Sequence, residues 1–261
     1  MAKIHPTAIV NKKARVDSVE VGPYAIIEDD VTIGKGTKVM AHAYICSGTT
    51  IGEDCEVHMG AVLGHTPQHL QFKGGKSYLK VGDKNIFREY SSVHRGFKEG
   101  ASTLIGNDNF FMGFSHIAHD CRIGDNVVIC NGALVAGYAV VEDKAFISGN
   151  ATIHQFVKIG TLAMIGGLAR VNKDVVPYML IEGDSEVCSP NLVGLKRSEI
   201  SEKAKAQIRN IYKLIYRSGL NVSQALDEIA KVGGLTDEAR HMVEFIKSSE
   251  RGICKHRKTA L

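Results

Sequence analysis

The sequence contains no tryptophan, and leucine and the other aromatic residues are scarce. Its 261 residues include 8 Tyr, 9 Phe, 15 Leu and 5 Pro, against 24 Ile, 24 Val and 27 Gly. β-Branched residues favour strands, whereas helical proteins are normally rich in Leu. The composition therefore excludes a helical bundle. A hydrophobic fraction of 44% also excludes a disordered or collagen-like chain.

Signals of secretion and membrane insertion are missing as well. The first residues, MAKIHPTAI, contain no signal-peptide core, and the six cysteines form no C-x-x-C pair. The longest largely apolar stretch, 127–141, is interrupted by Asn131, Gly132 and Gly137, so it is not expected to span a bilayer. We expect a reducing, cytoplasmic compartment and no integral membrane segment.

The net charge of +4 is unevenly distributed. Residues 1–195 contain 18 Lys and Arg against 20 Asp and Glu, which gives −2, whereas residues 196–261 contain 14 against 8, which gives +6. A basic segment can bind an acidic partner, either nucleic acid or an acidic protein, although a solvated basic helix face is the commoner explanation.

A six-residue period organises most of the chain. Of the 28 residues found at every sixth position from Ile9 to Val171, 24 are Ile, Val, Leu or Phe, and nine of these precede Gly. Neither an α-helix of period 3.6 nor a strand of period 2 produces this register. Hexapeptide repeats form a parallel β-helix with three short strands in each coil of eighteen residues. We predict a left-handed parallel β-helix over residues 1–192.

Four of the 28 positions break the pattern: Arg15, His69, Gly75 and Glu99. Arg15 belongs to a poorly patterned first coil. The other three fall in two segments, 65–79 and 96–103, which we predict to be loops that protrude from the β-helix. Loops on a rigid scaffold often carry binding residues.

The repeat ends after Val171, and the chain then becomes helical. Apolar residues at Ala204, Ile208, Ile211 and Ile215 follow helical spacing. We predict a small C-terminal α-helical domain over residues 193–261.

The eighteen-residue coil brings distant residues into columns. His119, Gly137 and Gln155 are spaced by eighteen and should lie in one column, with His154 beside them. A histidine base, a glycine N–H and an amide could together deprotonate a nucleophile and stabilise an oxyanion. Solvated histidines are common on such edges, but the convergence with His116 and Asp120 favours a functional site.

A metal site is the less favoured interpretation of these histidines. The His116-x-x-His119 pair and a ligand from another chain could bind zinc, as in β-helical carbonic anhydrases. We expect no metal, because no Glu-rich proton-transfer setting lies nearby in the sequence.

Four segments carry a resemblance to a known family. They are HIAHDC at 116–121, ATIHQF at 151–156, GLKR at 194–197 and IRNIYKLIYRSG at 208–219. With the hexapeptide repeats, they make the chain resemble the UDP-N-acetylglucosamine 3-O-acyltransferase family, which performs the first step of lipid A biosynthesis.

The resemblance implies roles for individual residues. In that family the general base falls on His119, its orienting partner on Asp120 and the oxyanion donor on the Gly137 amide. The predicted substrate contacts are His116, His154, Gln155, Gln68 and His69, with Asn191 and Arg197 at the nucleotide and phosphates. Met164 and Gly167 correspond to the residues that measure the acyl chain.

The resemblance also implies substrates and partners. The acyl donor is a thioester on the 4'-phosphopantetheine of acyl carrier protein, the acceptor is UDP-N-acetylglucosamine or a close analogue, and no other cofactor is used. Family members are homotrimers with active sites between subunits. The acidic carrier protein would bind the basic C-terminal segment, so no nucleic acid partner is expected.

Departures from the family pattern leave the acceptor open. Where the family has Pro-Gln-Asp-Leu-Lys, this chain has His69 and Gln71 at the Asp and Lys positions, and Tyr138 replaces a histidine after Gly137. An acceptor with a 3-amino group is therefore one alternative. A coenzyme A-dependent acyltransferase for another sugar and a catalytically silent scaffold are the others.

Overall fold

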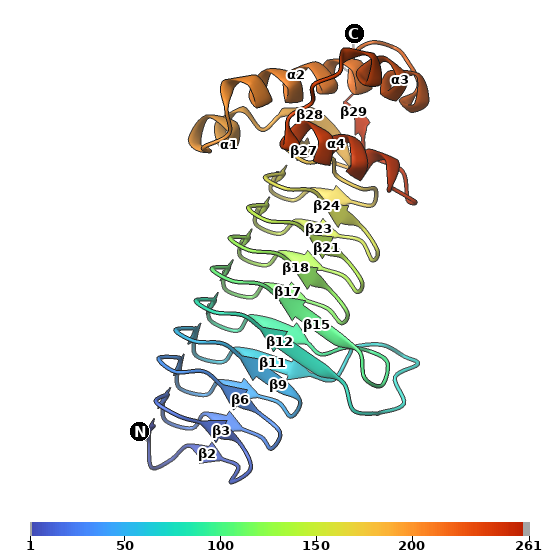
Figure 1. Ribbon diagram of the computed structural model, residues 1–261. Helices are drawn as coiled ribbons and strands as arrows, with labels where there is room; N and C mark the ends of the chain where they lie inside the picture. The colour runs from blue at the N-terminus through green and yellow to red at the C-terminus, as the bar shows by residue number, and fades with distance from the viewer. Residues whose placement is uncertain (1, 258–261) are drawn as a thin grey trace.

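The structure is a computed structural model that describes residues 2–257. It is an elongated stack of β-coils with helices packed at one end (Figure 1). The stack has three sheets, whose strands pair in parallel with those of the coil above and below. The predicted parallel β-helix followed by α-helices is confirmed.

The first sheet has twelve strands, and its last three lie beyond the repeats. Its strands are β1 (Lys3–Ile4), β4 (Glu20–Val21), β7 (Lys38–Val39), β10 (Glu56–Val57), β13 (Ile86–Phe87), β16 (Phe110–Phe111), β19 (Val128–Ile129), β22 (Phe146–Ile147), β25 (Met164–Ile165), β27 (Met179–Glu182), β28 (Glu186–Pro190) and β29 (Lys255–His256).

The other two sheets complete the three-sided coils. The second contains β2 (Ile9–Val10), β5 (Ile26–Ile27), β8 (Tyr44–Ile45), β11 (Val62–His65), β14 (Ser92–His94), β17 (His116–Ile117), β20 (Leu134–Val135), β23 (Thr152–Ile153) and β26 (Arg170–Val171). The third contains β3 (Arg15–Val16), β6 (Thr32–Ile33), β9 (Thr49–Ile51), β12 (Tyr78–Val81), β15 (Ser102–Ile105), β18 (Arg122–Ile123), β21 (Val140–Val141) and β24 (Lys158–Ile159).

The repeated aliphatic residues form the core. In most of the strands the second residue is buried and the first is exposed or half-buried, so one residue of the pair faces inward and the other outward. Ile117, Val135, Ile153 and Val171 are paired from coil to coil and are all at most 2% exposed. Because each β-branched residue packs on its equivalents, stability accumulates along the stack.

The predicted register is wrong in the first coil. Ile9 is 64% exposed, and Val10 pairs with Ile27 in its place. Val16, instead of Arg15, pairs with Ile33. The reason is that Val16 and Val21, the next inward residue, are five positions apart, whereas the repeat requires six.

A ladder of side-chain hydrogen bonds ties successive coils together at one corner. The backbone N–H groups of Asp83, Asn107 and Asp125 each donate to the side-chain oxygen of the equivalent residue in the next coil, over 2.8, 2.6 and 2.9 Å. Two of the three acceptors are carboxylates, and charge-assisted bonds to backbone donors are stronger than neutral ones. This corner is therefore held together by side chains as well as by the sheets.

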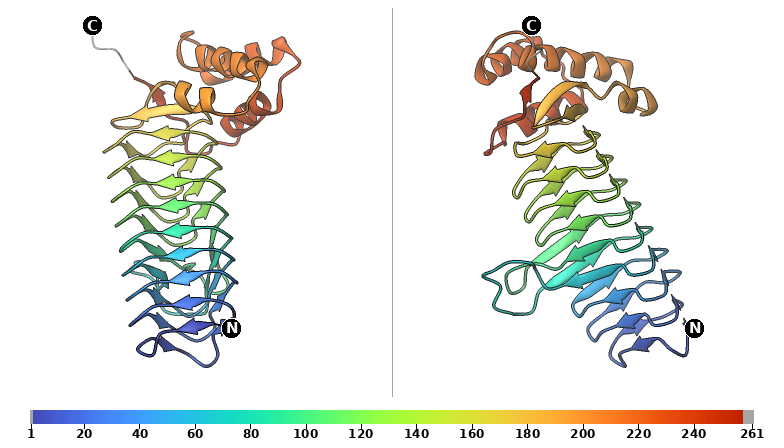
Figure 2. Two further views of the ribbon diagram at one scale, coloured as in Figure 1. Left: turned by 90° about the vertical axis from the view of Figure 1, so that its left-hand side faces the viewer. Right: turned by 180° about the vertical axis from the view of Figure 1, so that it is seen from behind.

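Two segments project from the coils. Residues 66–77 connect β11 to β12, and residues 95–101 connect β14 to β15. Both project from the same side of the stack (Figures 1 and 2). The Gly100 N–H donates to the Lys76 carbonyl over 2.8 Å, and the rings of His69 and Phe97 are 4.3 Å apart. The two projections therefore support each other.

The C-terminal region contains α1 (Leu192–Arg197), α2 (Glu202–Tyr216), α3 (Val222–Val232) and α4 (Asp237–Lys247). They cover the end of the stack, as Figure 2 shows, and β29 then returns to pair with β28. The division of the chain into two domains at residue 192 stays a prediction. Within residues 2–257, no helix has the length and apolarity needed to cross a membrane.

A histidine and a carboxylate join α4 to the β-helix. His241 Nε2 lies 2.7 Å from Glu142 Oε2, which also accepts from the N–H and the hydroxyl of Thr161, each over 2.8 Å. The bond to Glu142 raises the pKa of His241. The His241 and Thr161 bonds lower the pKa of Glu142 against the opposing effect of burial. The charged pair therefore stabilises the docked helix.

Replacing His241 with Ala should lower the free energy of unfolding by about 1 kcal/mol, because solvent screens this partly exposed pair. The histidine contribution is full below its unfolded pKa of 6.5 and is lost as pH rises through the higher folded pKa. The glutamate contribution is full above 4.5 and is lost as pH falls through the lower folded pKa.

The difference between wild type and His241→Ala should thus be largest between pH 4.5 and 6.5 and shrink at pH 9. Urea unfolding at several pH values measures it. Arg240→Ala is the control, because within residues 2–257 the Arg240 side chain bonds only Asp237 and Leu235 of its own helix and the preceding turn. A difference that does not change with pH would contradict the ion pair.

Candidate active site

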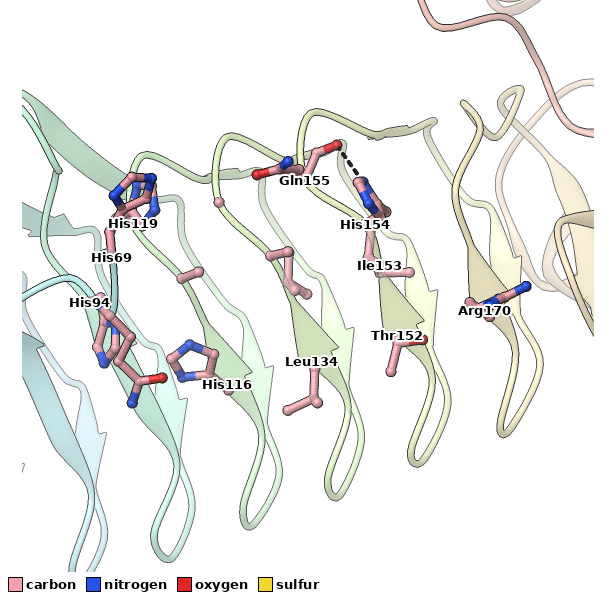
Figure 3. Close-up of a pocket in the computed structure, with 15 residues that line it drawn as sticks. His69, His94, His116, His119, Leu134, Thr152, Ile153, His154, Gln155 and Arg170 are labelled. Carbon is pink, nitrogen blue, oxygen red and sulfur yellow. Dashed lines mark hydrogen bonds between the residues drawn. The ribbon is translucent and has the colours of Figure 1, made fainter. Parts of the chain in front are cut away.

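A cavity of about 510 Å³ lies along the outward face of β17, β20, β23 and β26 and the adjoining corner (Figure 3). Seven of the residues predicted from the sequence line it: Gln68, His69, His116, His119, Gly137, His154 and Gln155. They come from three successive coils and one projecting segment. The eighteen-residue column and the projecting segment therefore meet at a single place.

His119 is oriented by its neighbour Asp120. His119 Nδ1 lies 2.7 Å from Asp120 Oδ2, and the His119 residue is only 7% exposed. An ionised carboxylate can only accept, so Nδ1 carries the proton and Nε2 is free to take another. Asp120 is itself held, because its Oδ2 accepts from the Phe97 N–H over 2.9 Å and its own N–H donates to the Thr103 hydroxyl over 2.8 Å.

Gly137 lies directly against the His119 ring. The Tyr138 N–H donates to the His119 carbonyl over 3.0 Å, which places Gly137 one coil further along the stack. A Cβ at Gly137 would be 2.8 Å from His119 Cε1 and 2.9 Å from Nε2, so only glycine fits. Among the described residues, the Gly137 N–H donates to no acceptor. A base and a free backbone donor are thus side by side.

Three aromatic rings surround His119. The rings of His69 and Phe97 both have centroids 5.5 Å away, and the Tyr138 ring meets it edge-on at 5.2 Å. Burial and the nearby Asp120 carboxylate raise the pKa of Tyr138, so its hydroxyl stays protonated. The projecting segments and the next coil therefore restrict the movement of the imidazole.

A second pair of histidines is kept uncharged at the opposite wall. Burial, with the neighbouring histidines, lowers the pKa of His94 to about 3, and burial lowers the pKa of His116. Their rings meet edge-on at 4.7 Å. The Gln68 N–H points to His94 Nδ1 over 3.3 Å, and His116 Nδ1 bonds the Ser92 hydroxyl over 2.8 Å. Both rings can therefore act as neutral hydrogen-bonding groups.

His154 is contacted by the C-terminal region. Arg251 Nη2 lies 3.0 Å from His154 Nδ1, and Arg251 Nε donates to the Asn172 carbonyl over 2.8 Å. Nδ1 also lies 3.2 Å from the Gln155 carbonyl, a contact drawn in Figure 3. Nδ1 can make only one of these two hydrogen bonds, because it would accept from Arg251 but would have to donate to the carbonyl. The charged guanidinium makes the stronger bond and can only donate, so the His154 proton lies on Nε2.

The other predicted residues lie elsewhere in the chain. Asn191, Arg197 and Met164 line a separate cavity of about 910 Å³ beside α1. The Asn191 side chain accepts from the Gly194 N–H and donates to the Leu162 carbonyl, each over 2.9 Å, and so caps the helix. Gly167 lines neither cavity. Within one chain these residues are not brought to His119.

Several cavity residues were missed by sequence reasoning: His94, Leu134, Thr152, Arg170 and the more distant Arg251. Leu134, Thr152 and Arg170 follow His116 at intervals of eighteen, so extending the outward column would have found them. The residue paired with His116 in the previous coil is Ser92, twenty-four positions earlier because a projecting segment intervenes, and His94 follows two residues after it. The contact of Arg251 depends on how the helices pack, and no spacing in the sequence signals it.

No metal-binding arrangement is found in the part of the chain that the structure describes. Within residues 2–257, no three His, Cys, Asp or Glu side chains converge as ligands. His119 Nδ1 bonds the Asp120 carboxylate, and His116 Nδ1 bonds the Ser92 hydroxyl. The predicted absence of a metal stays a prediction.

Comparison with known proteins identifies close relatives. Residues 174–254 match the family described as Udp N-acetylglucosamine O-acyltransferase, Domain 2, and residues 30–65 and 102–137 match the bacterial transferase hexapeptide repeats. A protein of Thermodesulfovibrio yellowstonii named acyl-[acyl-carrier-protein]--UDP-N-acetylglucosamine O-acyltransferase is 41% identical, over 98% of this chain and 100% of its own. A protein of the same name from Syntrophobacter fumaroxidans is also 41% identical, and the match covers 97% of this chain and 100% of that protein.

Solved structures agree with the sequence matches. The UDP-N-acetylglucosamine acyltransferase of Bacteroides fragilis superposes with a TM-score of 0.92 at 38% identity, covering 96% of this chain and 99% of that one. A structure from Acinetobacter baumannii superposes with a TM-score of 0.92 at 38% sequence identity, covering 97% of this chain and 99% of that one.

The neutral state of His94 can be tested by its titration. NMR signals of the His94 ring should not change between pH 8 and 5, because its pKa is lowered to about 3. The unfolded chain gains this proton below about pH 6.5, so stability should fall by about 1.4 kcal/mol per pH unit from this residue alone. In His94→Gln that slope should vanish, as measured by urea unfolding at pH 7 and 5. A His94 midpoint near 6.5 would contradict burial of the ring.

Proposed function

Because the chain belongs to the UDP-N-acetylglucosamine O-acyltransferase family, we propose that it transfers an (R)-3-hydroxyacyl chain from acyl carrier protein to the 3-hydroxyl of UDP-N-acetylglucosamine. This is the first step of lipid A biosynthesis, and we place it in the cytoplasm. The relatives match over 97–98% of this chain, which confirms the family resemblance seen in the sequence. The enzyme is an O-acyltransferase that depends on acyl carrier protein.

The observation that carries the mechanism is the pairing of His119 with Asp120 beside the free Gly137 N–H. His119 Nε2 removes the proton from the sugar 3-hydroxyl as its oxygen attacks the thioester carbonyl. The negative charge that develops on the carbonyl oxygen is stabilised by the Gly137 N–H, and the Asp120 carboxylate stabilises the imidazolium.

The second half of the reaction returns the proton. The carbon–sulfur bond of the tetrahedral intermediate breaks, and the 4'-phosphopantetheine thiol leaves with the proton held on His119. The products are the acylated UDP-sugar and the free carrier thiol, so atoms and charges balance without a metal or another cofactor. Desolvation around His119, which is 7% exposed, strengthens these electrostatic interactions.

The remaining cavity residues position the substrates. His154 Nε2–H and the Gln155 amide can donate to sugar or acyl oxygens one coil beyond Gly137, and the neutral His116 ring can bond at the opposite wall. Gln68 and His69 reach the cavity from the projecting segment 66–77. They are placed to contact the sugar close to the reacting hydroxyl.

A homotrimer would complete this site. Arg197 lies in a different cavity from His119 within one chain, although it has the chemistry to bind the diphosphate of a nucleotide sugar. In a homotrimer with sites between subunits, Arg197 and Asn191 of one copy would serve His119 of the next. Met164 and Gly167 would then border the acyl chain. The basic segment 196–261 would bind the acidic carrier protein.

A 3-amino acceptor is the second candidate, and the position of His69 favours it. The His69 ring lies 5.5 Å from His119, where the family resemblance places a carboxylate. An imidazole carries no negative charge, so it would not hold an attacking amine in its protonated, unreactive form as a carboxylate would. Mass spectrometry of products from UDP-N-acetylglucosamine and its 3-amino analogue, supplied separately, distinguishes the two acceptors.

Replacing His119 with Ala should lower kcat about 10²- to 10⁴-fold, the range expected for loss of a general base. Product formation is measured with (R)-3-hydroxyacyl carrier protein and each acceptor. His5→Ala, which removes an exposed histidine of the first coil, is the matched control and should retain activity. Unchanged activity of His119→Ala would show that His119 is not the general base. No transfer by the wild type would favour a scaffold role, and transfer from acetyl-coenzyme A but not from the carrier would show a different enzyme.

The shared site predicts complementation between two inactive variants. His119→Ala and Arg197→Ala homotrimers should each be weakly active, whereas coexpressed mixed trimers should regain a substantial part of the wild-type rate. Differently tagged copies allow the mixed trimers to be purified and assayed. If mixed trimers show only the average of the two variants, each site is built from one chain and the shared arrangement is wrong.

A further inference from the structure

The C-terminal segment 248–254 is attached to the end of the β-helix by one buried carboxylate. Asp174 is 1% exposed, and its Oδ2 accepts from the Ser249 hydroxyl over 2.6 Å. Its N–H donates to the Gly252 carbonyl over 3.0 Å, and its carbonyl accepts from the Cys254 N–H over 2.8 Å. A buried charge is stable only where such bonds replace those to water. The segment is therefore bound at a defined place.

Two lysines of the β-helix reach the same segment. Lys158 donates its N–H to Asp174 Oδ1 over 2.8 Å and its ammonium to the Ser248 carbonyl over 3.1 Å. The Lys173 ammonium donates to the Arg251 carbonyl over 2.7 Å. Contacts therefore lie before, at and after Arg251, so its backbone is fixed in place.

This attachment directs the Arg251 side chain to the edge of the His119 cavity. Its Nε donates to the Asn172 carbonyl over 2.8 Å, and its Nη2 lies 3.0 Å from His154 Nδ1. The carbonyl bond orients the planar guanidinium, which then presents Nη2 to the imidazole. His154 lines the cavity, whereas Arg251 stands behind it (Figure 3). Arg251 can therefore act on a bound ligand through His154.

The His154 ring has two competing partners that require opposite tautomers. A guanidinium can only donate, so the bond to Arg251 places the ring proton on Nε2. A bond to the Gln155 carbonyl would place the proton on Nδ1 and leave Nε2 as an acceptor. His154 is exposed, and within residues 2–257 its side chain bonds no other group. Arg251 therefore decides whether His154 offers the cavity a donor or an acceptor.

Resting on the proposed function, we propose that Arg251 is a positioning residue for acyl transfer, which holds His154 as a donor through Nε2–H. Carbonyl and phosphate oxygens only accept hydrogen bonds, so a donor at this place can bind either substrate, whereas an unprotonated Nε2 would repel such an oxygen. The segment 248–254 thus contributes to the site through its contact with His154.

Nitrogen NMR of the histidine rings tests the tautomer. At pH 8, wild-type His154 should carry its proton on Nε2, and its signals are assigned by their loss in His154→Ala. Arg251→Met cannot donate, so a substantial fraction of the His154 rings should then carry the proton on Nδ1. A wild-type ring protonated on Nδ1 would overturn the proposal, and this measurement decides the matter even if Arg251→Met is unstable.

The kinetic test is a double-mutant cycle. Measuring kcat/KM for UDP-N-acetylglucosamine at saturating acyl carrier protein removes any effect of the lost charge on carrier affinity. Arg251→Met should lower kcat/KM about tenfold, the size expected for loss of one hydrogen bond, and His154→Ala should lower it at least as much. Because Arg251 acts through His154, the double variant should be no less active than His154→Ala.

A purely structural role of Arg251 would not depend on His154. It would make the two effects additive, and that result would refute the proposal, as would an unchanged kcat/KM in Arg251→Met. Arg122→Met is the matched control, because it removes an exposed arginine of β18 on another sheet. It should keep both the wild-type kcat/KM and the wild-type tautomer of His154.

Failure of the inference and failure of the proposed function give different results. Wild-type protein that acylates no UDP-sugar refutes the proposed function. Wild-type protein that acylates the sugar, but in which the effects of Arg251→Met and His154→Ala add, refutes the inference alone.

Discussion

The whole structure depends on one constraint, the stacking of equivalent β-branched residues from coil to coil. Each inward Ile or Val packs on its counterpart, so the register of one coil fixes that of the next. A column such as Ile117, Val135, Ile153 and Val171 leaves no freedom to slip, because a shift of one residue would turn the apolar side chains outward. The ladder through Asp83, Asn107 and Asp125 repeats the same spacing at a corner.

This rigid register is what makes the candidate site possible. His119 and Gly137 belong to neighbouring coils, and the close contact between the imidazole and the glycine backbone is set by the coil spacing. The Asp120 bond to Nδ1 then leaves His119 Nε2 as the nitrogen that can accept a proton. Catalytic groups on a packed scaffold need no rearrangement as charge develops, which is the main source of electrostatic catalysis.

Burial divides the histidines of the cavity into different roles. His94 and His116 are desolvated and stay neutral, whereas His119 has a carboxylate partner that can stabilise its protonated form. The outward column continues past them to Arg170, which lines the same cavity and bonds Asp184.

The sequence by itself determined the repeat, the parallel coils, the helical C-terminus and the convergence of His119, Gly137 and Gln155, because a strict period specifies which residues stack. It misplaced the first coil, where one residue is missing between Val16 and Val21. Only the tertiary structure decided that His69 packs against His119, that Arg251 reaches His154, and that Arg197 lies in a separate cavity. These contacts join segments that share no period, so their positions follow from three-dimensional packing and not from spacing along the chain.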